Sequence, residues 1–224
     1  MVPGGPLTTD TVRAGATGAG PGGGAVGDSA RQETAAGVVL LGLSIVGAGV
    51  IHLYPGMNAL DRRGFALVGR SPGSAELLRI TDLGTPVALV LVTLVAAVIA
   101  VRHDRWRAAA CVVGPLLTAV LVEFVLKPTV GRHYLGVLSY PSGNVADVAA
   151  VVTALALAVP RPARPVVVVA GAVAVGMMTV AVVGLRWHYP TDALAGAVLG
   201  VGTVLTVDGA VHLRPFRPAP HPQR

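Results

Sequence analysis

Three short polar segments in the second half of the chain hold residues that could bind an anion and attack an electrophilic atom. They are Lys127–Pro–Thr–Val–Gly–Arg132–His133, Tyr140–Pro–Ser–Gly–Asn144 and Arg186–Trp–His188–Tyr–Pro–Thr–Asp192. Lys127, Arg132 and Arg186 are cationic and border long apolar stretches. Such residues either reach toward lipid headgroups or hold an anionic ligand.

His188 and Asp192 form a candidate pair for nucleophilic or base chemistry. They stand four residues apart where an apolar helix is expected to begin, with Pro190 in its first turn. At that spacing the carboxylate can hold the imidazole in one tautomer and orientation. The histidine can then act as a nucleophile or a base. A metal site is the alternative, but the further ligands that zinc requires are not apparent.

The Pro141–Asn144 turn comes directly before another apolar segment. Ser142 or Asn144 could cap the helix that follows, and Gly143 allows backbone N–H groups to approach a ligand closely. Because free N–H groups at helix N-termini bind phosphate, this turn is a candidate phosphate cradle. A purely structural turn explains the same four residues.

The elements that must position these residues follow from composition. Of 224 residues, 53% are hydrophobic and 12% are charged, about half the charge of an ordinary soluble domain. The apolar residues come in long blocks, which excludes a soluble domain, a disordered chain and an outer-membrane barrel. We therefore predict an all-α, polytopic membrane bundle of about six helices. The apolar segments are 36–54, 84–101, 107–126, 145–159, 165–185 and 191–212.

Three regions follow from this pattern. Residues 1–35 are rich in Gly and Ala and are expected to form a disordered tail, residues 36–213 the membrane domain, and residues 214–224 a tail rich in Pro and Arg. The loop between the first two segments could form a short interfacial helix. Cys111 lies in an apolar run and is expected to be a packing residue.

The charge distribution predicts a topology. The net charge of +6 includes no Lys/Arg run or interleaved aromatics that would indicate nucleic-acid binding. Short connections that carry several arginines favour the cytoplasmic side, namely Arg102, Arg105, Arg107, Arg161 and Arg164. We therefore expect a multi-pass plasma-membrane protein with both termini in the cytoplasm. All three polar segments then meet at the extracytoplasmic face.

Together the three segments resemble the type 2 phosphatidic acid phosphatase family of the vanadium haloperoxidase-like superfamily. That family's pattern is K-x6-R-P, then P-S-G-H, then S-R-x5-H-x3-D, on a six-helix membrane core. The resemblance implies that His188 attacks phosphorus to form a phosphohistidine and that Asp192 orients it. It assigns Ser142 and Gly143 to the phosphate-cradling turn and Lys127 to phosphate binding. It also implies metal-independent chemistry with no cofactor.

This chain departs from the family pattern at several positions. Tyr134 stands where the first arginine is expected, and Arg132 and Arg186 are displaced candidates for the guanidinium charge. Asn144 replaces the histidine that serves as general acid, and an amide cannot donate a full proton. His133 is a candidate replacement, although an interfacial loop residue is the simpler interpretation. A diphosphate leaving group would lessen the need for an acid.

Glu123 lies four residues before Lys127, near the end of an apolar segment. An intramembrane carboxylate is a functional candidate, but an i,i+4 pair that positions the lysine is the simpler interpretation. A transporter that uses Glu123 is the weakest hypothesis for the chain.

The leading hypothesis is a lipid phosphatase that hydrolyses a lipid phosphomonoester or an isoprenoid diphosphate. A catalytically impaired relative that binds lipid phosphate, or keeps only the scaffold, is the alternative. The predicted catalytic residues are His188, Asp192 and His133. The predicted phosphate-binding residues are Lys127, Arg132, Ser142, Gly143, Asn144 and Arg186.

Overall fold

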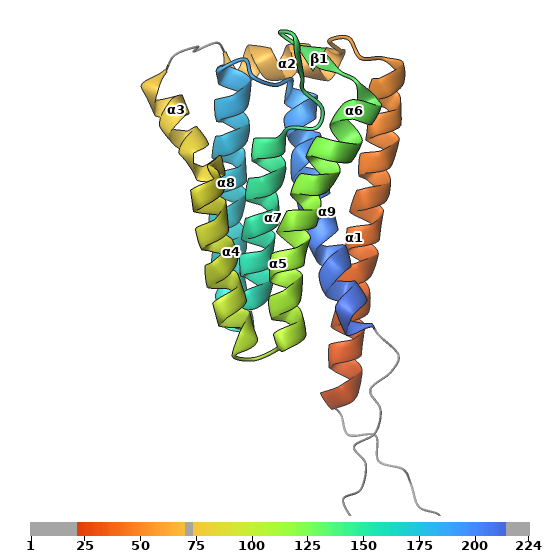
Figure 1. Ribbon diagram of the computed structural model, residues 1–224, viewed down its shortest axis with the longest axis vertical. Helices are drawn as coiled ribbons and strands as arrows, with labels where there is room; N and C mark the ends of the chain where they lie inside the picture. The colour runs from red at the N-terminus through yellow and green to blue at the C-terminus, as the bar shows by residue number, and fades with distance from the viewer. Residues whose placement is uncertain (1–21, 70–73, 214–224) are drawn as a thin grey trace, which may run out of the picture.

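Six long helices run side by side in the computed structural model, which describes residues 22–69 and 74–213 (Figure 1). They are α1 (Gly22–Leu53), α4 (Pro86–Val101), α5 (Arg105–Val120), α7 (Gly143–Ala158), α8 (Arg164–Gly184) and α9 (Pro190–His212). The first connection folds into α2 (Ala59–Val68), α3 (Ala75–Thr81) and a 3₁₀ turn, η1 (Asp82–Gly84). A further 3₁₀ turn, η3 (Arg161–Ala163), precedes α8.

A continuous helical path extends α5 toward the first polar segment. It passes through a π-helical stretch, η2 (Leu121–Leu126), into α6 (Lys127–Val130). A small antiparallel hairpin follows, with β1 (His133–Tyr134) paired to β2 (Val137–Leu138). Figure 1 shows this hairpin and α2 together at one end of the bundle.

The helices agree with the six predicted apolar segments. Four of them are long and apolar enough to cross a membrane: Ala30–Leu53, Arg105–Val130, Arg161–Gly184 and Pro190–His212. The α3–η1 segment and α4 form a bent pair at 46° that passes the same test together. Helix α7 is apolar but has only 16 residues. Apolar side chains such as Val87, Phe124 and Val166 are exposed on the sides of the bundle, as expected for contact with lipid. The chain is thus a multi-pass helical membrane protein.

The predicted N-terminal boundary is wrong. Helix α1 begins at Gly22, so residues 22–35 belong to a helix and not to a disordered tail. Packing explains part of the added helix: Thr34 of α1 packs against Gly209 of α9, where a larger residue would collide with its Cβ. Residues 1–21 and 214–224, where we expected tails, lie outside the described residues. The expected helix in the first connection is confirmed by α2.

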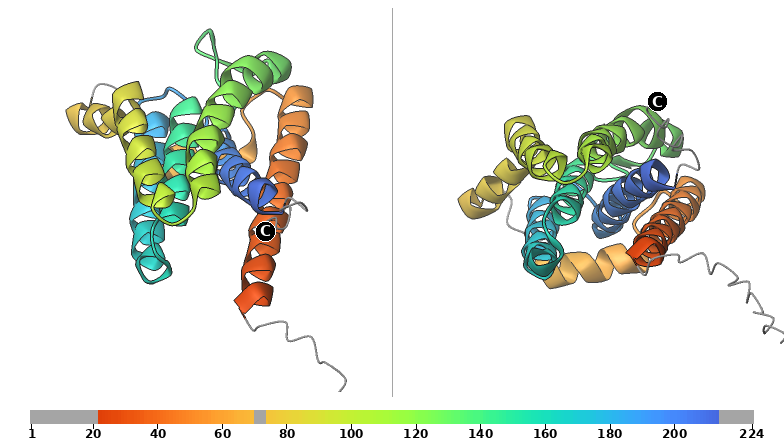
Figure 2. Two further views of the ribbon diagram at one scale, coloured as in Figure 1. Left: turned by 60° about the horizontal axis from the view of Figure 1, so that its bottom comes forward. Right: turned by 90° about the horizontal axis from the view of Figure 1, so that it is seen from below.

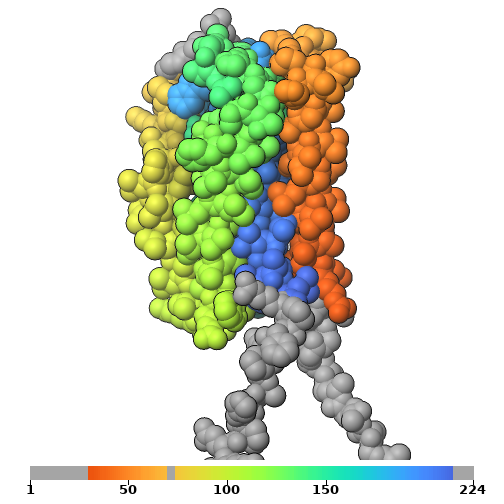
Figure 3. Space-filling view, turned by 45° about the vertical axis from the view of Figure 1, so that its right-hand side comes forward, coloured from red at the N-terminus to blue at the C-terminus, as the bar shows by residue number. Residues whose placement is uncertain are grey.

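Helix α7 is the central element of the bundle. It contacts α4, α5, α8 and α9, and the view along the bundle shows it enclosed by other helices (Figure 2). Helix α9 is covered by α1 and α5, and only a narrow strip of it is visible between them in Figure 3. The second and third polar segments therefore start the two most enclosed helices.

Two glycines allow α7 and α9 to pack backbone to backbone. A Cβ at Gly196 would lie 2.5 Å from the carbonyl oxygen of Ser142, and one at Gly200 would collide with the carbonyl oxygen of Ala146. Small residues four apart let membrane helices approach closely, where dispersion contacts hold them. This contact fixes the N-terminus of α7 against the first turns of α9, where the polar segments meet.

Candidate active site

Lys127 and Glu123 form an ion pair beside the start of α7. Lys127 Nζ lies 2.5 Å from Glu123 Oε1, which confirms the i,i+4 interpretation. Glu123 lies in the π-helical stretch, an irregularity common at functional sites, and Lys127 is the first residue of α6 directly after it. A Cβ at Gly143 would lie 3.0 Å from Glu123 Oε1 and 3.8 Å from Lys127 Nζ. The glycine therefore leaves room for the charged pair to reach the second polar segment.

The N-terminus of α7 presents unpaired polar groups to this pair. Ser142 is the N-cap residue, but its side chain makes no capping bond. Its Oγ is buried and has no hydrogen-bond partner among the described residues. The first N–H groups of a helix also lack intrahelical acceptors. These donors, with the helix dipole, suit a phosphate group.

A reversal of the chain after α8 places His188. The N–H groups of Arg186 and Trp187 donate to the carbonyls of Val183 and Val182, at 3.1 and 2.9 Å. This is a Schellman motif, with Arg186 in the left-handed position at φ 62° where glycine is usual. Helix α8 ends at Gly184, and the motif reverses the chain at Arg186, two residues before His188.

The imidazole of His188 is held by the backbone. Its Nδ1 lies 2.8 Å from the carbonyl oxygen of Ser139, so Nδ1 carries the proton and Nε2 carries the lone pair. Burial lowers the pKa of His188 to about 4, and Lys127 acts in the same direction, against the Ser139 bond and Glu123. The side chain is therefore neutral at pH 7 and has a nitrogen suited to nucleophilic attack.

Arg132 lies in a different, closed cluster. Its side chain is 0% exposed, and all five of its N–H donors have acceptors. Two carboxylates, one hydroxyl and two carbonyls accept them at 2.5–3.1 Å: Asp192, Asp61, Thr191, Pro55 and Gly56. Its guanidinium also lies 3.8 Å from the ring centroid of Tyr189. No donor remains for a phosphate.

Two predicted roles are therefore corrected. Arg132 has no donor free for a phosphate in this structure, because its guanidinium is saturated and buried. Asp192 does not hold His188, because Asp192 Oδ1 accepts from Arg132 at 2.5 Å and its Oδ2 accepts from the N–H of Tyr189 at 3.1 Å.

Asp192 still supports the site from a distance. Its carbonyl oxygen accepts from the N–H of Ser142 at 3.0 Å, which ties α9 to the turn before α7. Its carboxylate holds Arg132, whose carbonyl oxygen accepts from the N–H of Ser139 at 2.9 Å. Ser139 in turn holds His188. A chain of contacts therefore runs from Asp192 through Arg132 and Ser139 to His188.

The remaining predicted residues lie around the cluster. The guanidinium of Arg186 lies 3.9 Å from the ring centroid of Phe65 on α2. His133 is exposed on the hairpin, and its Nδ1 lies 2.9 Å from the carbonyl oxygen of Gly131. Asn144 packs against Gly84 at the break before α4. None of these three has a described contact with His188, so their assigned roles remain predictions.

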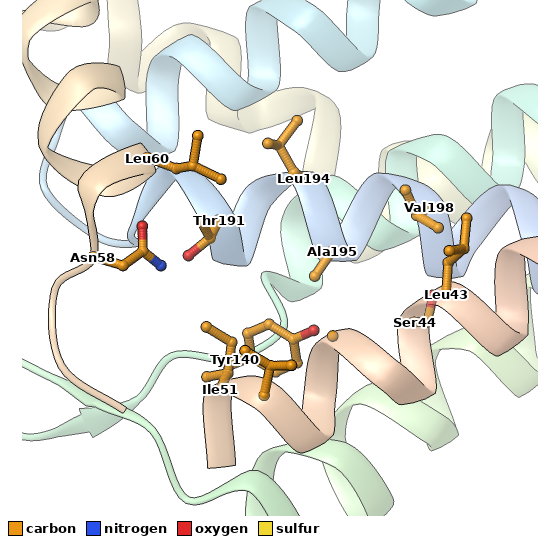
Figure 4. A pocket seen from close by; sticks show the side chains of 12 residues that line it. Leu43, Ser44, Ile51, Asn58, Leu60, Tyr140, Thr191, Leu194, Ala195 and Val198 are labelled. Atoms are coloured by element: carbon orange, nitrogen blue, oxygen red, sulfur yellow. The ribbon is translucent and has the colours of Figure 1, made fainter. Parts of the chain in front are cut away.

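An apolar groove opens between α1 and α9 beside this end of the bundle (Figure 4). Its volume is about 330 Å³. Tyr140, which follows Ser139, lines it together with Thr191 and Asn58 at the polar end. Most of the remaining lining is aliphatic and includes Leu43, Val50, Ile51, Leu194 and Val198. The groove has the chemistry to accept a hydrocarbon chain.

Two groups in contact with the predicted residues, Asp61 and the carbonyl of Ser139, were missed in the sequence. Asp61 accepts from Arg132 at 2.6 Å and from the N–H and hydroxyl of Thr191. Burial raises the pKa of Asp61, but the bonds from Thr191 and Arg132 outweigh it and lower that pKa overall. The Asn58-x-x-Asp61 capping pattern was the available signal. The carbonyl of Ser139 is a backbone group, so a motif made of side chains could not reveal it.

The fold and this site define a class: a membrane-embedded helical bundle with unpaired polar groups at a helix N-terminus and a neutral histidine at one end. A solved structure has the same fold. Described as the first transmembrane PAP2 type phosphatidylglycerolphosphate phosphatase from Bacillus subtilis, it matches with a TM-score of 0.63 at 24% identity. The match covers 81% of this chain and 98% of that one, and it shows a common fold.

A comparison with protein families points the same way. The sequence model of the PAP2 superfamily matches residues 108–214, which contain all three polar segments. This confirms the resemblance predicted from the motifs and supports a phosphoric-ester hydrolase. Comparison with curated protein sequences gives no match.

Proposed function

We propose that the chain is an integral-membrane lipid phosphatase that hydrolyses a lipid phosphomonoester or an isoprenoid diphosphate through a phosphohistidine. The observation that carries this proposal is His188 itself. It is neutral, its Nδ1 is fixed by Ser139, and the charges that act on its pKa are those of Lys127 and Glu123. Lys127 in turn lies beside Gly143 at the N-terminus of α7.

The first step forms a bond from Nε2 of His188 to the terminal phosphorus and breaks the phosphorus–oxygen bond to the leaving group, which is a lipid alkoxide for a phosphomonoester and a lipid phosphate for a diphosphate. Lys127 and the N–H groups at Gly143 and Asn144 neutralise the charge on the phosphoryl oxygens, as this transition state requires. The carbonyl of Ser139 stabilises the positive charge that develops on the imidazole, because it accepts from Nδ1. Water then attacks phosphorus, breaks the nitrogen–phosphorus bond and releases phosphate.

The leaving group decides how much an acid matters. With a diphosphate, the departing oxygen belongs to a phosphate and needs no proton. With a phosphomonoester, an alkoxide must be protonated, and the loss of a general acid at Asn144 costs about 10²–10⁴-fold. An isoprenoid diphosphate is therefore the better substrate in this proposal.

A lipid substrate at the outer leaflet is consistent with two features. Tyr140 lines the apolar groove and directly follows Ser139, whose carbonyl contacts the proposed nucleophile. The arginines of the short connections favour the opposite end of the bundle as the cytoplasmic one. We therefore place the site at the extracytoplasmic face of the plasma membrane.

The test offers the purified protein in detergent a panel of lipid phosphates with a chelator present. Phosphatidate, phosphatidylglycerol phosphate and a polyprenyl diphosphate are compared, with His188→Ala as the control. We expect chelator-resistant phosphate release that the control lacks. Equal release by the wild type and the control would refute the proposal.

A catalytically impaired protein that binds lipid phosphate is the second candidate, and Asn144 is the observation that favours it. The substitution Asn144→His separates the two. A large gain from no activity would identify a decayed site. Little change from a measurable rate would support the active enzyme.

A further inference from the structure

A second polar pocket lies at the end of the bundle opposite His188. It has a volume of about 340 Å³, where the ends of α4 and α7 meet the starts of α5 and α8. Helix α7 runs from Gly143 to Ala158, so the pocket is about 24 Å from the turn beside His188. Its polar lining is His103, Asp104, Arg107, Arg161 and Arg164.

Two carboxylates near this pocket, Asp208 and Asp104, are already engaged. Asp208 accepts two bonds from Arg107, at 3.1 and 3.0 Å. Asp104 accepts from the N–H groups of Trp106 and Arg107, and its Oδ2 lies 2.7 Å from His212 Nε2. Asp208 thereby neutralises Arg107. The remaining positive charge of the pocket comes from Arg161 and Arg164, and Glu33 compensates part of the charge of Arg164.

Arg161 and Arg164 have unused donor capacity. Arg164 donates from Nη2 to the carbonyl of Leu157 at 3.2 Å, but its Nε is buried and has no hydrogen-bond partner among the described residues. Its nearest carboxylate, Glu33, lies 3.5 Å away and is shared with Arg107 at 3.6 Å. Arg161 is exposed at the pocket rim. A buried donor without an acceptor is rare in proteins, so an anionic ligand would complete this arrangement.

The rest of the lining indicates what carries the anion. Ala100, Leu157 and Ala158 form an apolar floor, and the pocket lies at the ends of membrane-spanning segments. We propose that it binds the phosphate of an anionic phospholipid, with Arg161 and Arg164 on the phosphate and the apolar floor against the glycerol and upper acyl carbons. Basic pockets between membrane helices bind such headgroups.

The two tryptophans allow a direct test, because Trp106 lies at this end and Trp187 at the other. In a Trp187→Phe background, nanodiscs with brominated phosphatidylglycerol or brominated phosphatidylcholine report lipid contact by quenching Trp106. We expect about a tenfold preference for phosphatidylglycerol. The double substitution R161Q/R164Q is expected to remove the preference. Equal quenching by both lipids would overturn the proposal.

Single substitutions supply the matched control. Arg161 and Arg102 are both exposed at this end, but only Arg161 lines the pocket. R161Q is expected to reduce the preference about fivefold, and R102Q is expected to leave it within about twofold. An equal loss of the phosphatidylglycerol preference in R102Q would show a general effect of surface charge and would overturn the proposal that this pocket binds the lipid.

Inorganic phosphate distinguishes a lipid from a soluble ligand. In detergent, the lipid assignment predicts that added phosphatidylglycerol raises the thermal midpoint at concentrations where inorganic phosphate does not. An equal rise with inorganic phosphate, lost in R161Q/R164Q, would overturn the lipid assignment. Because these readouts measure binding, they do not depend on hydrolysis at His188.

Discussion

Two charged clusters at one end of the bundle use similar residues for different purposes. The Arg132 cluster joins one guanidinium to Asp61 and Asp192, all with side chains 0% exposed. The Lys127–Glu123 pair is open, with side chains 18% and 48% exposed. Arg132 has used its five donors, whereas a lysine ammonium has three and Lys127 has one described bond, to Glu123.

The difference indicates that donor saturation, more than charge, decides whether a cation has a donor free for a further ligand. A guanidinium enclosed by fixed acceptors cannot reorganise around a substrate without leaving carboxylates unpaired in a buried site. An ammonium at the edge of a helix N-terminus can. The closed cluster fastens α2, the hairpin and α9 together, and the open pair faces the turn where phosphate is expected.

The largest effect is expected from breaking the closed cluster. Asp192→Asn removes one of two carboxylates from a buried guanidinium, which should lower the free energy of unfolding by about 3–5 kcal/mol. Unfolding in mixed detergent micelles with increasing SDS measures the change. Lys127→Met is the control, because loss of an exposed pair should cost less than about 1 kcal/mol. An equal loss in the free energy of unfolding for the two variants would contradict the assignment of one cluster as structural and the other as open.

A smaller effect is expected at the contact that brings the clusters together. Gly200→Ala places a methyl group against the carbonyl of Ala146, and the forced shift of α9 should cost about 1–3 kcal/mol. The same unfolding assay measures it. Gly176→Ala on α8 is the matched control, since nothing lies within 4 Å of its Cβ position. A neutral Gly200→Ala would argue against close α7–α9 packing.

The smallest effect concerns pH. Because burial lowers the pKa of His188 to about 4, the nucleophile should stay almost fully neutral at pH 5.5, and the rate set by its protonation should fall less than about twofold from pH 7. At an ordinary pKa near 6.5, only about a tenth would be neutral at pH 5.5. The measurement is the pH dependence of kcat/KM with a diphosphate lipid. A tenfold fall by pH 5.5 would place His188 in a more solvated setting.

The same pKa has a consequence for stability. A histidine whose folded pKa lies below its unfolded value destabilises the folded state as pH falls from about 6.5 to about 4. The unfolded chain then binds a proton that the folded protein does not. Replacing His188 with Asn should reduce the pH dependence of the free energy of unfolding between about pH 4 and pH 6.5. Above pH 7 the pH dependence should be the same in the variant and the wild type.

Long apolar blocks made the six helices predictable, because 36–54 through 191–212 each approach the length of a membrane crossing. The motifs also placed His188, Lys127 and Gly143 at one end. The motifs could not show which acceptors surround Arg132 or which group holds His188. Asp61 lies 71 positions from Arg132 in the sequence, and the acceptor on His188 is a backbone carbonyl, which every residue has.

The direct test of the account compares one variant from each cluster in the same assay. Asp61→Asn and Lys127→Met are assayed for phosphate release from a polyprenyl diphosphate, per folded molecule and below both melting temperatures. The account predicts that Asp61→Asn keeps the rate within about threefold, whereas Lys127→Met loses about 100-fold. A reversed order would contradict it, because the closed cluster would then hold the phosphate.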